Sequence, residues 1–108
     1  MEVKLVVERL NIGRVRYGHG VRPGDDTTQW GTKKNSWLEM CQEEIIDGMI
    51  YICADYIRET NTPYDDDANE LILKYIIDTS EVKKCFHQSM LISLKYTLSM
   101  LILRQKTC

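Results

Sequence analysis

Residues 36–58 (SWLEMCQEEIIDGMIYICADYIR) carry the strongest helical pattern in the chain. Apolar residues recur there every three or four positions, which places them on one side of an α-helix. These residues are Leu38, Cys41, Ile45, Met49, Ile52 and Tyr56. Ser36 with Glu39 three positions later has the spacing of a capping box, so the helix is expected to begin at Ser36. A long helix with one apolar side must pack against other elements, and this requirement most constrains the fold.

The opposite side of this helix is acidic. It carries Glu39, Glu43, Glu44 and Asp47. Like charges four residues apart destabilise a helix by a few tenths of a kcal/mol per pair, and no Lys or Arg lies in residues 38–57 to offset them. A cation is therefore expected against this side, and a hard divalent cation such as Mg²⁺ prefers such oxygen ligands. The pattern fits a plain solvated surface equally well. Under either interpretation Glu39 is a capping residue, a ligand, or both.

The rest of the chain predicts an all-α fold. Residues 1–15 favour a helix, although 3–7 would also suit a short strand. Residues 16–34 contain four of the six glycines and one of the two prolines, which predicts a loop. Further helices are predicted at 65–78, where three acids suit a helix N-terminus, and at 81–104. We therefore expect one domain over 1–108, a small helical bundle with a long N-terminal loop.

The last predicted helix is apolar on most of its surface. Val82, Phe86, Met90, Leu94, Leu98 and Leu101 share one side, and Cys85, Ile92, Tyr96, Met100 and Leu103 cover much of the rest. Two other long helices can cover only one side of it. The other side is expected to be buried by a second copy, so the chain is predicted to be a homo-oligomer, at least a dimer.

Composition excludes several classes of partner. The net charge is −2 and no basic stripe is present, so no nucleic-acid polymer is expected as a ligand. The apolar run 90–103 is too short and too polar to span a bilayer, and no signal peptide is visible. The four cysteines show no CxxC spacing and no nearby cluster of histidines: Cys41, Cys53, Cys85 and Cys108. Free thiols and a cytoplasmic location are expected.

The predicted loop and the residues just before it are rich in groups that bind nucleotides. Arginine pairs with phosphate, and aromatic rings stack on bases. The candidates are Arg14, Arg16, Tyr17, His19, Arg22 and Trp30. The alternative is that Tyr17 and Trp30 plug the end of the bundle while the arginines pair with the acids of the long helix.

A family resemblance adds to these observations. EEIID at 43–47, on a helix that begins with Trp37 after the basic loop RYGHG, resembles the first metal-binding helix of the all-α nucleoside triphosphate pyrophosphohydrolases. These are the MazG-like and dimeric dUTPase-like enzymes, which include small phage versions. The resemblance covers about residues 8–58, roughly half of the chain. It implies a helical bundle that uses Mg²⁺ to cleave a nucleoside triphosphate to monophosphate and pyrophosphate, in the cytoplasm of a bacterial host if the chain is a phage protein.

The resemblance also implies roles for the acids. Glu43, Glu44 and Asp47 would hold the metal, and Glu39 and Glu43 would be catalytic, with Glu39 as a ligand or base. The family's second acidic motif, ExxD on the following helix, is not present in DDDANELILKYIID, where Asp67 and Glu70 occur in the reverse order. A binding protein that sequesters a nucleotide or a cyclic nucleotide signal without turnover is therefore the alternative. A purely structural interaction module is a third possibility.

Overall fold

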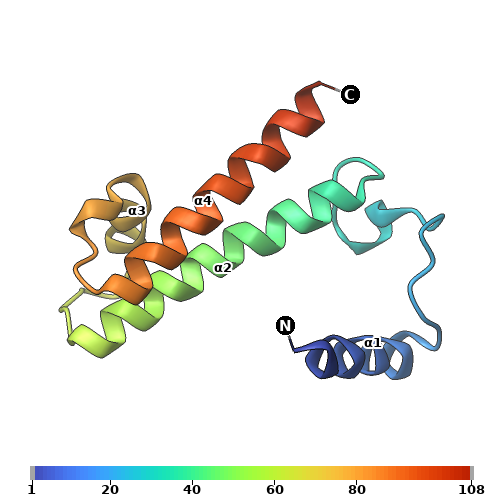
Figure 1. Ribbon diagram of the computed structural model, residues 1–108, viewed down its shortest axis with the longest axis horizontal. Coiled ribbons are helices and arrows are strands. Elements are labelled where there is room, and N and C mark those ends of the chain that lie inside the picture. The colour runs from blue at the N-terminus through green and yellow to red at the C-terminus, as the bar shows by residue number, and fades with distance from the viewer. Residues whose placement is uncertain (1, 108) are drawn as a thin grey trace.

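The computed structural model describes residues 2–107, and within them the chain contains helices and no strand. In chain order the elements are α1 Val3–Tyr17, the 3₁₀ turn η1 Thr27–Trp30, α2 Trp37–Thr60, α3 Asn69–Ile77, the 3₁₀ turn η2 Thr79–Glu81 and α4 Cys85–Lys106 (Figure 1). The predicted all-α class is confirmed, and the N-terminal segment is a helix rather than a strand.

The core lies where α2 and α4 run antiparallel beside α3 (Figure 1). Cys53 and Leu91 are fully buried at its centre. The complete set of buried apolar side chains is Met49, Cys53, Tyr56, Ile57, Tyr75, Val82 and Leu91. All of the α2 members come from its C-terminal half. The apolar stripe predicted from the sequence continues into the first turns of α2, but Leu38 and Cys41 are exposed there because no described element covers them.

Local side-chain contacts explain where the helices begin and end. Ser36 caps α2, since its hydroxyl accepts a hydrogen bond from the Glu39 N–H at 3.1 Å. The predicted helix at 65–78 begins only at Asn69, where the Asp67 carboxylate accepts the Asn69 N–H at 3.0 Å. The predicted helix at 81–104 begins only at residue 85, because η2 ends at Glu81 and residues 82–84 connect it to α4 without helical structure. Asp78 caps that turn through Ser80.

Helix α1 stands apart from the α2–α4 pair and buries none of its residues (Figure 1). The radius of gyration is 16.6 Å, whereas a compact chain of this length is expected to have about 13 Å. The accessible surface is 8454 Å², against about 6,200 Å² for a compact monomer of this mass. The chain by itself therefore leaves much apolar surface in water.

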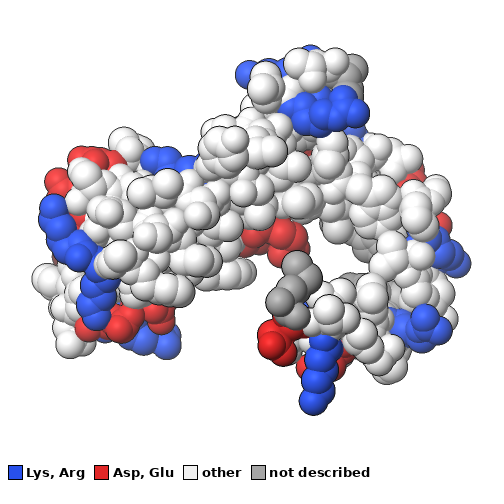
Figure 2. Space-filling model, in the orientation of Figure 1, with Lys and Arg blue, Asp and Glu red and all other residues white. Residues whose placement is uncertain are grey.

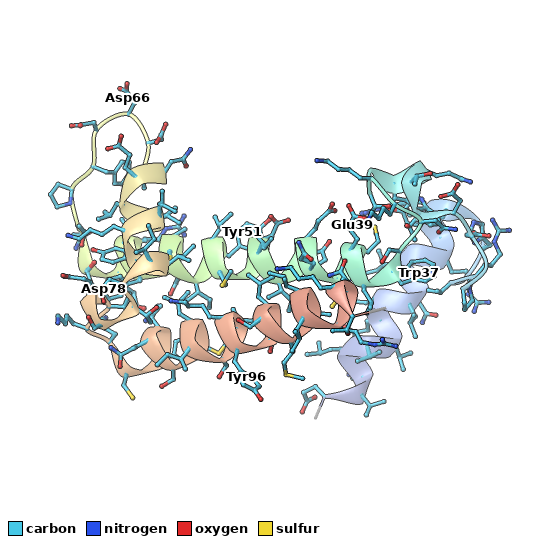
Figure 3. The ribbon with its side chains drawn as sticks, turned by 90° about the horizontal axis from the view of Figure 1, so that it is seen from above. Trp37, Glu39, Tyr51, Asp66, Asp78 and Tyr96 are labelled. Atoms are coloured by element: carbon cyan, nitrogen blue, oxygen red, sulfur yellow. The ribbon has the colours of Figure 1, made fainter. Side chains whose placement is uncertain are left out.

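The exposed surface of α4 accounts for part of this excess. Phe86, Ile92, Tyr96, Met100 and Leu103 are all more than half exposed, and Tyr96 projects away from α2 (Figure 3). Phe86 shares a predicted side of the helix with Met90 and Leu94, but only the latter two are half-buried. No described helix combines the length and the apolar character needed to cross a membrane.

Candidate functional site

A buried threonine organises the loop between α1 and α2. Thr27 is fully buried, and its hydroxyl lies 2.8 Å from that of Thr32, which in turn donates to the Lys34 carbonyl at 2.6 Å. The Thr27 hydroxyl oxygen also accepts the N–H of Ser36 at 2.7 Å, and the Thr27 N–H donates to the Asn35 side chain. These bonds tie the loop to the first turn of α2.

The closed loop brings together the two tryptophans of the chain. Trp30 ends η1 and Trp37 begins α2, with their ring centroids 5.8 Å apart and their planes inclined by 32°. Gly31 allows the reversal between them, with a φ of 102° that favours glycine. The Trp37 Nε1–H donates to the Pro23 carbonyl at 2.9 Å, which fixes that ring. A rigid aromatic pair results at the surface.

A pocket of about 420 Å³ lies between this aromatic pair and α1. The C-terminal half of α1 supplies one wall through residues spaced by three or four positions, which share a helix face. Residues 19–22, Asp25, Trp30, Trp37 and Met40 supply the rest. The lining residues are Arg9, Leu10, Gly13, Arg14, Tyr17, His19, Gly20, Val21, Arg22, Asp25, Trp30, Trp37 and Met40.

The charge of the pocket is mainly positive. The lining contains three arginines and one carboxylate, that of Asp25. This carboxylate accepts a hydrogen bond from Nε of Arg22 at 2.9 Å. This contact uses only one of the three guanidinium nitrogens of Arg22. The Nδ1 of His19 lies 2.7 Å from the Gly20 carbonyl. Because a carbonyl oxygen can only accept a hydrogen bond, Nδ1 of His19 carries a proton, and Nε2 takes no part in this contact.

The structure gathers five of the six predicted ligand-binding residues in this pocket. These are Arg14, Tyr17, His19, Arg22 and Trp30. Arg16 lies outside it, beside a separate hollow with Asn11, Ile12 and Val15. Arg9 and Trp37 also line the pocket and were not predicted. The signal for Arg9 was its spacing of four and eight from Gly13 and Tyr17, which places all three on one face of a helix.

Glu39 holds the loop against α2. Its carboxylate accepts the N–H of Lys33 at 2.9 Å and that of Lys34 at 3.1 Å (Figure 3). The hydrogen bond from Lys33, followed by that from Lys34, lowers the pKa of Glu39 below its usual value. Only half of the predicted capping box forms, since the Ser36 N–H donates to Thr27 instead of Glu39.

The other predicted acids lie exposed on α2, beyond the pocket. Glu43, Glu44 and Asp47 are all exposed, and Figure 2 shows acidic side chains beneath the middle of α2, on the side of α1. Met40 lines the pocket, and Glu43 and Glu44 follow it by three and four residues, one helical turn further on. Within residues 2–107 the structure shows no ion pair between these acids and the pocket arginines.

A different group of side chains comes close enough to share an ion. Among the described residues, Asp55, Glu59 and His87 are the only three His, Cys, Asp or Glu side chains whose potential ligand atoms all lie within 4.8 Å of one another. The Nε2 of His87 lies 2.8 Å from Oδ2 of Asp55 and 3.2 Å from Oε2 of Glu59. These residues could not be grouped from the sequence, because His87 is 28 positions from Glu59 and only the packing of α4 on α2 unites them.

The described cysteines are free thiols: Cys41, Cys53 and Cys85. Burial raises the pKa of Cys53 to about 11, so this thiol is unreactive at neutral pH. Cys108 lies outside the described residues.

Comparisons of the chain with protein-family models, with curated proteins and with solved structures found no match.

Proposed function

We propose that the chain binds a nucleoside phosphate in the pocket between α1, the loop and the start of α2. The single observation that supports this most is the composition of the pocket, where Arg9, Arg14 and Arg22 lie around the Trp30–Trp37 pair. Guanidinium groups form charge-assisted, often bidentate hydrogen bonds with phosphate. Base stacking on an aromatic ring contributes about 1–3 kcal/mol in single-stranded nucleic-acid complexes. A ligand with both a base and phosphates uses both kinds of side chain.

Hydrolysis of that nucleotide is the second candidate function, in keeping with the resemblance to the all-α pyrophosphohydrolases. One observation favours it: the exposed acids Glu43 and Glu44 begin one turn beyond the pocket-lining Met40. Mg²⁺ held there with Asp47 would lie close to phosphates bound by the arginines. Mg²⁺ bound there would supply Lewis-acid activation of the phosphate and of a water molecule. Glu39 is already bonded to two backbone N–H groups, which favours a positioning role over that of base.

We also propose that a second copy of the chain covers the apolar surfaces of α1 and α4. The free thiols of Cys41 and Cys85 are exposed, which fits a reducing compartment such as the cytoplasm.

The test compares two arginines of one helix. Arg14 lines the pocket, while Arg16, two residues on, does not. Affinity for a panel of nucleoside triphosphates, measured by calorimetry with and without Mg²⁺, should fall by about 1.5–3 kcal/mol in Arg14→Ala, roughly 10- to 150-fold. Arg16→Ala should bind like the parent protein. Equal affinities in the parent and Arg14→Ala would contradict the proposed pocket.

Pyrophosphate release with Mg²⁺ separates the two functions. Turnover that disappears in Glu43→Gln and Asp47→Asn, while nucleotide affinity without metal is retained, would establish the hydrolase. Binding without release from any nucleotide in the panel would exclude hydrolysis and leave the binding function.

A further inference from the structure

The side chain of His87 is buried and is aimed at two carboxylates of another helix. It is 3% exposed, and its ring packs between those of Tyr56 and Phe86, with centroids 5.5 and 5.2 Å away. Nε2 faces Asp55 and Glu59, while Nδ1 has no hydrogen-bond partner among the described residues. All polar contacts of the ring are therefore made at Nε2, and the aromatic neighbours fix its direction.

The two carboxylates lie on successive turns of α2, close to each other. Like charges at this spacing repel, and Nε2 can give its single proton to only one acceptor along a straight hydrogen bond. Lys84 contacts the cluster from one side, with Nζ 3.0 Å from Oε1 of Glu59, the oxygen that does not face His87. The hydrogen bond from His87 lowers the pKa of Asp55 below its usual value.

We propose that Asp55, Glu59 and His87 form a binding site for a borderline divalent metal ion such as Zn²⁺, with water completing the coordination. One imidazole nitrogen and two carboxylate oxygens are ligands that such ions accept, whereas Mg²⁺ prefers oxygen alone. Tetrahedral bonds of 2.0–2.1 Å place ligand atoms roughly 3.3 Å apart. The present separations from Nε2 are 2.8 and 3.2 Å.

Only a small outward movement is needed for the ion to enter. The side chains of Asp55 and Glu59 are 56% and 48% exposed, so both can move into solvent while the buried ring stays in place. The ion binds the lone pair of Nε2, so the bound ring is neutral with its one proton on Nδ1; a ring that starts neutral with the proton on Nε2 passes it to Nδ1 through solvent, and a ring that starts doubly protonated releases the Nε2 proton to solvent. The bound ion would connect the C-terminal half of α2 to the first turn of α4.

This site is separate from the proposed nucleotide pocket. Asp55 follows Met40 by fifteen residues, which is about 22 Å along α2. The site with His87 also differs in metal preference from Glu43, Glu44 and Asp47, which offer only oxygen ligands and so suit Mg²⁺. The inference does not depend on nucleotide binding, and either proposal can fail without the other.

The test uses Zn²⁺ and Co²⁺ alone, without nucleotide, on the full-length protein. Calorimetry should show one Zn²⁺ per chain, and Co²⁺ should give the visible absorption of a low-symmetry site with a nitrogen ligand. Asp55→Asn and His87→Gln should each weaken binding at least tenfold. Because His87 is buried and its replacement can impair folding, Glu59→Gln, at an exposed side chain, serves as a third variant with the same expected loss.

Two controls make the result specific. Cys85 lies two residues before His87, and thiolates bind Zn²⁺, so the series is made in a Cys85→Ser background. The double variant Glu43→Gln, Asp47→Asn should keep full Zn²⁺ affinity. Absence of Zn²⁺ and Co²⁺ binding in the background protein would overturn the proposal. So would full affinity in folded Asp55→Asn and Glu59→Gln, or loss of binding only in the double variant.

Discussion

Glu39 shows how one side chain can serve the fold in a position that the sequence assigned to chemistry. Its spacing from Ser36 and its place among the acids supported a cap, a metal ligand or a base. Its carboxylate instead accepts two backbone N–H groups of the preceding loop. The alternatives could not be separated from the sequence, because the partner groups are backbone N–H groups of Lys33 and Lys34, which almost any residue at those positions would supply.

A pH-dependent contribution to stability follows from the lowered pKa of Glu39. A carboxyl group whose pKa is lower in the folded state stabilises the fold above its unfolded pKa, and this contribution is lost as the pH falls through the folded value. Glu39→Gln should therefore be less stable than the parent in urea unfolding at pH 7, and the difference should shrink toward pH 3. Glu43→Gln, in metal-free buffer, is the matched control and should show no such pattern. A pH-independent difference for Glu39→Gln would contradict the assignment.

At the scale of elements, the sequence predicted α2 well and the loop poorly. Apolar periodicity and the Ser36 cap gave α2 to within two residues at its C-terminal end, because both signals are local. Glycine content correctly predicted that residues 18–26 have no regular helix, but not that η1 and the Thr27 hydrogen bonds would make the loop rigid. Five of the residues that line the pocket could be named from their chemistry, whereas Arg9 and Trp37 could not. Their assembly depended on α1 folding back beside the loop, which no periodicity predicts.

Thr27→Val tests whether these hydrogen bonds hold the loop. The substitution keeps the shape but leaves the N–H of Ser36 without its acceptor, and an unsatisfied buried donor costs about 1–3 kcal/mol. Unfolding followed by tryptophan fluorescence reports this region directly, since both tryptophans lie there. The free energy of unfolding should fall by that amount. Gln29→Ala, at an exposed position of the same 3₁₀ turn and with no side-chain hydrogen bond among the described residues, should change it by less than about 0.5 kcal/mol. Equal effects of the two substitutions would show that Thr27 has no special role.

At the scale of the whole molecule, the exposed apolar surface is the main feature to explain. The accessible surface exceeds that of a compact monomer by roughly 2,000 Å², and a standard protein interface needs only about 800 Å² from each partner. An isolated helix of fifteen residues is marginal in water, yet α1 buries none of its residues against the rest of the chain. A second copy that covers α1 and the outer side of α4 would bury the excess apolar surface and would also give α1 a packing partner. The sequence predicted this need from the apolar residues around 81–104, but not the part of α1.

Lysine substitutions on α4 and elsewhere test that assembly. Met100 is 56% exposed on the outer side of α4, so Met100→Lys should turn a dimer into a monomer in sedimentation at micromolar concentration, because a charge in an apolar interface has no partner. Leu98 packs against the core of its own chain, so Leu98→Lys should instead lower the thermal stability of the fold itself. Asp66→Lys, on the exposed turn before α3 (Figure 3), should change neither property. A folded monomer of the parent protein at micromolar concentration would exclude this interface, and so would an intact dimer of Met100→Lys. If a second copy buries the outer side of α4, the two substitutions must act on different equilibria. Met100→Lys then weakens association, whereas Leu98→Lys weakens folding.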